Sequence, residues 1–138
     1  MKKALFSLLA FALVFGGFLN TQARAEYTVG GFVYDRDTGN HTVCDKLADS
    51  SKVHECAVNW CRQNHVSENN CAVDDCIFPG WTGIAMGWVD NGHGGKSYTT
   101  GESCGSKDKG EALRLAMYRC DIDYTEDCKF ITFFKVTE

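Results

Sequence analysis

The sequence is poor in proline and in positive charge. Its 138 residues include one proline, and 14 Lys and Arg stand against 18 Asp and Glu. The negative balance excludes a strongly basic nucleic-acid binder, and the length excludes a chain of several domains of ordinary size. The HExxH motif of zinc peptidases is missing. Residues 101–105 match the letters of the GxSxG motif of serine hydrolases, but the serine stands five residues before the predicted helix cap Asp108 and not at the strand-to-helix turn that this motif requires. We therefore assign no catalytic residue, no metal ligand and no cofactor from the sequence.

The sequence contains only one long apolar run, which stands at its start. Lys2 and Lys3 precede an uncharged apolar stretch, and Ala23-Arg24-Ala25 fits the small-x-small rule for cleavage. The stretch has about 16 residues, fewer than the roughly 20 that a membrane-spanning helix needs. We predict a cleavable signal peptide over residues 1–25. The protein should then be bacterial and secreted or periplasmic, with no membrane span after cleavage.

The predicted mature chain begins at Glu26 and has 113 residues. Cleavage removes three basic residues and no acid, which leaves 11 basic and 18 acidic residues and a formal charge of −7. A negative surface speeds encounter with positively charged molecules. We therefore expect a basic exported protein as the partner, and no nucleic acid. The sequence does not indicate an oligomeric state.

Eight cysteines lie in the predicted mature chain. An even number of cysteines in a small exported domain indicates a disulfide framework. Zinc is the alternative, because Cys56-x4-Cys61 and Cys71-x4-Cys76 are closely spaced, but neither pair is CxxC and an oxidising compartment favours cystine. The eight residues are Cys44, Cys56, Cys61, Cys71, Cys76, Cys104, Cys120 and Cys128.

The two halves of the mature chain share one order of patterns. Residues 30–39 and 83–92 are apolar, strand-like runs that end in an acidic turn with glycine. A cysteine, Cys44 or Cys104, comes next, and a helical pattern, an acidic pair, a cysteine and an apolar run complete each half. We predict a single α+β domain, residues 26–138, of two tandem strand–strand–helix–strand units with antiparallel sheets, over residues 27–78 and 81–134. Pro79 marks their junction.

Apolar residues at helical spacing indicate one helix in each unit. Asp49, Ser50 or Ser51 can cap the first helix, and Asp108 with Glu111 resembles a capping box at the second. The first apolar face is predicted to consist of Val53, Cys56, Ala57, Trp60 and Cys61. The second is predicted to consist of Ala112, Leu113, Ala116, Met117 and Cys120.

The repeated order of patterns also suggests how the cysteines pair, although eight cysteines allow 105 pairings. If each helix end is joined to the strand that follows it, the set is Cys61–Cys76, Cys120–Cys128, Cys56–Cys71 and Cys44–Cys104. Cys61–Cys71 is an open alternative to the first pair. Its separation of ten residues is close to the eight between Cys120 and Cys128.

The second half carries a pattern that resembles a known bacterial family. The pattern is Trp81-Thr82-Gly83-Ile84-Ala85, a glycine-rich turn, an alanine-containing helix that ends at Cys120, and Cys128 before an apolar strand. It resembles the exported proteins grouped as domain of unknown function 4189, over residues 81–134. The resemblance implies export and an α+β fold, and it attaches no catalytic role to these motifs.

The segment 91–97 is the best candidate for contact with a ligand or partner. It is rich in glycine, it follows a strand-like run that contains Trp88, and Asp90-Asn91-Gly92 is typical of a hairpin turn. Gly95-Lys96-Ser97 resembles the end of a phosphate-binding loop, but Asp90 stands where that pattern requires glycine. We predict a binding surface made of His93, Lys96 and Trp88.

A second acidic segment resembles the start of a calcium loop. It reads Asp35-x-Asp37-x-Gly39-Asn40. The twelfth position, where an EF-hand requires glutamate, is Lys46. We therefore interpret this segment as a turn.

The sequence leaves three functional hypotheses. The preferred one is an exported, non-enzymatic binding protein that inhibits or antagonises another exported protein. It is motivated by the disulfide scaffold, the negative charge and the lack of a catalytic motif in its required context. The second is a small exported enzyme or effector toxin that uses the His93 loop. The third is a structural component of the cell envelope. Stoichiometric activity would favour the first hypothesis, and turnover would favour the second.

Overall fold

The computed structural model describes residues 26–122 and 125–138. The predicted signal peptide, residues 1–25, lies outside the described residues. No helix in the described ranges is long and apolar enough to cross a membrane. The elements are, in order, β1 (Val29–Asp35), β2 (His41–Leu47), α1 (Ser50–Gln63), β3 (Cys71–Cys76), β4 (Gly80–Asp90), β5 (Lys96–Ser106), α2 (Lys109–Ile122) and β6 (Glu126–Val136).

The two halves of the chain have the same topology. β1 is the central strand of an antiparallel sheet ordered β2-β1-β3, and β4 is the central strand of a second sheet ordered β5-β4-β6. In each sheet, the first two strands form a hairpin. A helix then connects the second strand to the third, which pairs with the other edge of the central strand. The predicted α+β fold of two strand–strand–helix–strand units is confirmed. We call residues 29–76 the first unit and residues 80–136 the second unit.

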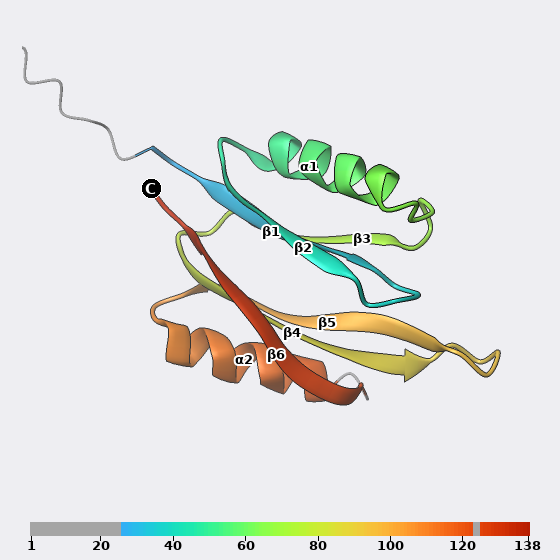
Figure 1. The fold of residues 1–138 in the computed structure, drawn as a ribbon. Coiled ribbons are helices and arrows are strands. Elements are labelled where there is room, and N and C mark those ends of the chain that lie inside the picture. The colour runs from blue at the N-terminus through green and yellow to red at the C-terminus, as the bar shows by residue number, and fades with distance from the viewer. Residues whose placement is uncertain (1–25, 123–124) are drawn as a thin grey trace, which may run out of the picture.

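The two sheets pack face to face and the helices cover their outer faces (Figure 1). Phe32 of β1 and Ile84 of β4 lie in the core between the sheets. Their neighbours Val33 and Ala85 point the other way, toward α1 and α2, because successive side chains of a strand alternate between its faces. Both faces of each central strand are covered, which explains why β1 and β4 are apolar without alternation.

Each helix begins at a predicted cap. The side chain of Asp49 accepts a hydrogen bond from Lys52 N at 3.0 Å. Asp108 accepts one from Glu111 N at 2.8 Å, and the carboxylate of Glu111 accepts one from Lys107 N at 2.9 Å. These bonds satisfy backbone donors that have no partner within the helix.

The buried positions of the two helices correspond. Both helices bury three residues spaced four apart, which gives each a narrow stripe toward its sheet. The wider faces predicted from the sequence are therefore only partly right. Leu113 is 42% exposed, because a turn of about 100° per residue carries it off the stripe. The buried residues are Val53, Ala57 and Cys61 in α1 and Ala112, Ala116 and Cys120 in α2.

The cysteines form four disulfides, which are Cys44–Cys56, Cys61–Cys71, Cys76–Cys104 and Cys120–Cys128. The predicted framework is confirmed, and zinc ligation by thiolates is wrong because no cysteine remains free. The pairing Cys120–Cys128 and the alternative Cys61–Cys71 are confirmed. The pairings Cys61–Cys76, Cys56–Cys71 and Cys44–Cys104 are wrong.

The wrong pairing of Cys44 with Cys104 comes from a shift of one residue along a strand. The helix-facing glycine of each central strand pairs with Cys44 in the first hairpin and with Ser103 in the second. Ser103 is therefore the counterpart of Cys44. Neighbouring residues of a strand point to opposite faces. Cys44 thus reaches Cys56 in the helix above it, whereas Cys104 reaches Cys76 across the two sheets.

Candidate functional site

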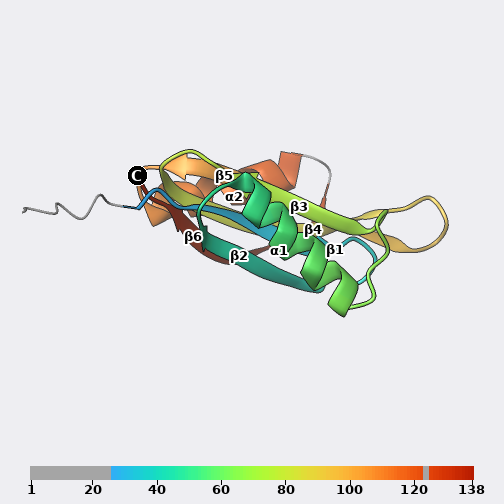
Figure 2. The ribbon, with the colours of Figure 1, turned by 90° about the horizontal axis from the view of Figure 1, so that it is seen from above.

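The three predicted contact residues come from the hairpin of β4 and β5. Trp88 lies in β4, Lys96 begins β5, and His93 stands in the loop between them. Figures 1 and 2 both show this hairpin projecting past the β1–β2 turn at one end of the molecule. The projection follows from strand length, because β4 and β5 have 11 residues each and β1 and β2 have 7 each.

Side chains hold the hairpin loop in one conformation. Asp90 Oδ1 accepts a hydrogen bond from Gly92 N at 2.7 Å. Asn91 Oδ1 accepts two, from His93 N at 2.9 Å and from Gly95 N at 3.1 Å. Two glycines of the loop have φ of +77°, a backbone conformation that other residues rarely adopt. A loop that is ordered before binding loses less entropy when a partner binds it.

Trp88 and Lys96 line a cavity of about 230 Å³ at the mouth between the two sheets. Lys96 Nζ lies 4.0 Å from the centroid of the Trp88 ring, which is a cation–π contact. The Trp88 Nε1–H is buried and has no hydrogen-bond partner among the described residues. A buried donor without an acceptor is unfavourable, so an acceptor that reached this N–H would stabilise it. His41, Tyr98 and Ile131 also line the cavity.

Both units contribute to this cavity. Gly39 of the β1–β2 turn has φ of +74° and packs on Tyr98, where an added Cβ would lie 2.9 Å from two ring atoms. The backbone N–H of Tyr98 donates to Arg36 O at 2.7 Å. Asp35 closes the same turn by accepting hydrogen bonds from Asp37 N and Thr38 Oγ1. The interpretation of this acidic segment as a turn is confirmed.

His93 does not belong to the cavity. It is exposed in the loop, and its ring forms no hydrogen bond or ion pair with any residue that the structure describes. A histidine that acts as a general base is normally oriented by a second group. The structure therefore brings Trp88 and Lys96 together and leaves His93 as a separate contact point.

A larger cleft, which the sequence did not predict, lies in the first unit between α1 and β3. Its volume is about 550 Å³, and the disulfide Cys61–Cys71 stands in its wall. One signal for it was present. Val58 is an apolar residue outside the buried stripe of α1 and is 50% exposed in the cleft. An apolar residue at this position indicates a cleft only when the orientation of α1 on its sheet is known.

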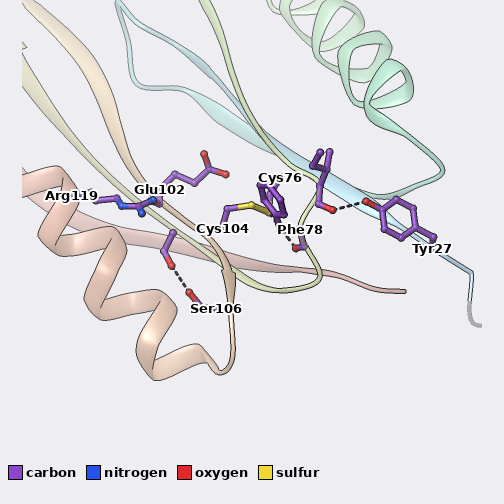
Figure 3. Close-up of a disulfide and its surroundings, with 9 residues drawn as sticks. Tyr27, Cys76, Phe78, Glu102, Cys104, Ser106 and Arg119 are labelled. Atoms are coloured by element: carbon purple, nitrogen blue, oxygen red, sulfur yellow. Dashed lines mark hydrogen bonds between the residues drawn. A yellow bond between two sulfur atoms is a disulfide. The ribbon is translucent and has the colours of Figure 1, made fainter.

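A carboxyl group is buried where the units are joined covalently (Figure 3). Glu102 stands beside the Cys76–Cys104 disulfide, and its Oε1 has no partner within the described part of the chain. Burial, followed by the charges of Asp74 and Asp75, raises the pKa of Glu102 to about 7. Burial also raises the pKa of Asp74. Glu102 and the two sulfurs are spaced like metal ligands, but the sulfurs of a disulfide are not thiolates.

No family model, curated protein or solved structure matches this chain. The resemblance of residues 81–134 to the family grouped as domain of unknown function 4189 therefore stays a prediction. The four disulfides point to an oxidising compartment.

Proposed function

We propose that this is an exported, secreted or periplasmic, non-enzymatic binding protein that inhibits or antagonises another exported protein. The observation that supports this is the hairpin of β4 and β5, which projects from a disulfide-braced body and carries a cavity at its base. An ordered, projecting loop beside a partly apolar cavity offers two contacts that an inhibitor can use. The loop can insert into a partner, and the cavity can bind a side chain of that partner.

The chemistry of the cavity favours a hydrogen-bond acceptor on the partner. Trp88 Nε1–H requires an acceptor, and the Lys96 ammonium lies over the same ring. The volume of about 230 Å³ is below the roughly 300–1,000 Å³ that is typical of small-molecule sites. It suits a single protein side chain, and an amide-bearing side chain supplies both the size and the acceptor.

The partner class that we propose is a basic exported protein. The formal charge of −7 that the mature chain would carry attracts a positively charged surface and speeds association. Binding should therefore weaken as salt is raised, because exposed charges are screened. The cavity anchors one neutral acceptor, and the rest of the surface provides the long-range attraction.

The test is a capture followed by a titration. Oxidised protein, residues 26–138, would be immobilised against the exported proteins of the host, beside Trp88→Ala and Tyr118→Ala. Tyr118 is the matched control, because it is an aromatic residue 59% exposed on α2. We expect one basic partner, bound stoichiometrically by the wild type and by Tyr118→Ala. With the purified partner, Trp88→Ala should bind at least about tenfold more weakly.

Three outcomes would contradict the proposal. Equal affinity of all three proteins would place the interface away from Trp88. The absence of any stoichiometric partner would argue against a binding protein. Turnover of a substrate that is lost in His93→Ala would favour the enzyme or toxin hypothesis. Reduced and alkylated protein is a further control and should not bind, because the cavity depends on the joined units.

A further inference from the structure

The cleft of the first unit has a filled counterpart in the second unit. In β3, Val73 follows the helix-linked Cys71 by two residues, and in β6, Phe130 follows Cys128 by two residues. The ring centroids of Phe130 and Phe133 are 4.4 Å apart, and Phe133 meets Trp81 at 6.3 Å. These rings face the α2 side of their sheet, because Phe133 pairs with a strand residue that abuts α2.

The smaller side chains of β3 leave the corresponding space beside α1 open. Val73 pairs with Val33 and so faces the helix. The connecting loop adds Val66 to the wall, and the helix adds Val58, which is half exposed. Half-exposed apolar side chains around an opening of about 550 Å³ form a surface that an apolar ligand can cover.

Two arginines stand at one end of this cleft. Arg62 follows Cys61 directly, and Arg36 follows Asp35, which is paired with Cys71. Both therefore flank the Cys61–Cys71 disulfide. Neither guanidinium forms a hydrogen bond or an ion pair with another side chain in residues 26–122 and 125–138. The charge of Arg36 does act on Asp74: burial raises the pKa of that carboxyl, and Arg36 lowers it by a smaller amount. One acid, Glu68, is among the lining residues, so the lining is cationic on a chain whose net charge is −4.

We propose that this cleft binds a small amphipathic carboxylate. The two guanidiniums hold the carboxylate at the disulfide end, where paired N–H donors match its two oxygens. The apolar body lies along α1, past Val58 toward His54. The eight residues from Arg62 back to His54 span roughly 12 Å of helix, which is about the length of an extended ten-carbon chain. The inference does not depend on the proposed function of the hairpin, and the residues that line the two openings differ.

The volume of the cleft supports a small molecule over a protein side chain. About 550 Å³ lies inside the roughly 300–1,000 Å³ range of ligand pockets, unlike the cavity at Trp88. The walls are also those of a ligand pocket, with apolar side chains and a few polar groups at one place. In the second unit, Phe130 and Phe133 occupy the corresponding face of the sheet, so the same fold also accommodates larger side chains there.

The probe is decanoate, kept below the concentration at which it forms micelles. It would be titrated into oxidised protein recovered from the exported fraction and followed by amide NMR. Decanol has the same body without the charge, and acetate has the charge without the body. We expect saturable 1:1 binding of decanoate with shifts confined to α1, β3 and the β1–β2 turn. Its affinity should exceed that of decanol and of acetate by at least about tenfold.

Variants separate the charge of the cleft from its shape. Arg62→Gln should weaken decanoate about tenfold and bring its affinity down to that of decanol. Lys52→Gln is the matched control, because Lys52 is a cation of α1 that pairs with Glu55 and does not line the cleft. Val73→Phe introduces the side chain that the second unit has at the corresponding position, Phe130. It should fill the cleft and abolish binding without changing the charge.

Val58→Asp provides a second test of shape that does not depend on refilling the core. Val58 is half exposed, so the protein should still fold, and a carboxylate there should repel the ligand. The proposal would be overturned if decanol bound as tightly as decanoate, or if Arg62→Gln and Val58→Asp both bound decanoate like the wild type. Shifts at the hairpin in place of α1 would also overturn it. None of these results bears on the capture test with Trp88→Ala.

Discussion

The two units share a topology but hold their helices in different ways. In the second unit, the sheet under α2 is built with glycines that let the helix backbone approach. A Cβ at Gly101 would lie 2.3 Å from Ala116 O, and a Cβ at Gly83 would lie 2.6 Å from Ala112 O. The helix therefore rests directly on the sheet, without side chains between the two backbones.

In the first unit, side chains and a second disulfide perform this role. A Cβ at Gly31 would meet the side chain of Val53 at 2.4 Å, and no helix backbone atom is among its nearest neighbours. Cys44–Cys56 ties α1 to β2, and the second unit has no counterpart of this bridge. Contact between backbones leaves no free volume, whereas contact through side chains leaves room for a cleft. One topology thus produces a filled unit and an open one.

The largest effect should come from Gly101→Ala. We expect it to lower the free energy of unfolding by about 3 kcal/mol, because the added Cβ would overlap backbone atoms of α2 and displace the whole helix. Chemical denaturation at a fixed pH measures the loss. Gly31→Ala should lower the free energy of unfolding by less, about 1–2 kcal/mol, because its new Cβ would meet the side chain of Val53, which can move more easily than a helix backbone.

Compensating changes test whether this difference is real. Val53→Ala should recover part of the loss in Gly31→Ala, because it removes the atoms that the new Cβ meets. Ala116→Gly should not restore the stability lost in Gly101→Ala, because the new Cβ at position 101 would meet backbone atoms of α2, which remain in the glycine variant. Recovery in the second unit, or equal losses in both units, would show that the helices are held alike.

Removal of either of the corresponding disulfides of the two units should have a smaller effect on stability. Cys61–Cys71 and Cys120–Cys128 close similar loops, with separations of 10 and 8 residues. Replacing both cysteines of either bridge with alanine should lower the free energy of unfolding by about 2–3 kcal/mol. Hydrogen exchange should then separate the two variants. Without Cys61–Cys71, the amides of α1 should lose protection, whereas α2 should keep its protection without Cys120–Cys128. Faster exchange in α2 than in α1 would contradict the comparison.

The smallest effect concerns the junction between the units. Burial raises the pKa of Glu102 from 4.5 to about 7, so the folded state holds this proton more tightly than the unfolded state. The contribution of Glu102 to stability is therefore fully present below pH 4.5 and is lost as the pH rises through 7. We expect Glu102→Gln to flatten this slope and to raise stability at pH 8 by about 1–2 kcal/mol. Thermal unfolding between pH 4 and 8 measures it.

Glu68→Gln is the control for that experiment, because Glu68 is exposed. It should leave the slope unchanged. A slope that stays the same in Glu102→Gln would mean that the pH dependence arises elsewhere, for instance at Asp74, whose pKa burial also raises.

Local patterns in the sequence predicted local structure well. Asp108 and Glu111 predicted a capping box because the two residues of that motif are three apart. Asp90-Asn91-Gly92 predicted the hairpin, and the hairpin brings Trp88 beside Lys96. Cys120–Cys128 was predictable because the helix and the next strand are consecutive.

Features that depend on which face a strand presents were not predictable. Cys104 and Ser103 are neighbours, and only the register of β5 determines which of them meets the helix. The cleft depends on the contrast between Val73 and Phe130 and on the distance between a helix and a sheet. No pattern in the sequence indicates that distance. The contribution of Tyr98 and the β1–β2 turn to the hairpin cavity likewise required the packing of the two units.

The bridge between the units has a consequence for resistance to peptidases. The segment between β3 and β4 is the only link between the units along the chain, and Phe78 within it is 64% exposed. Ile77 is also 47% exposed, so a peptidase could cut this link at the bond between Ile77 and Phe78. Cys76 and Cys104 lie on opposite sides of such a cut, so the nicked protein would remain one molecule. It would separate into two fragments only after reduction, so the protein could lose this peptide bond and still keep its fold.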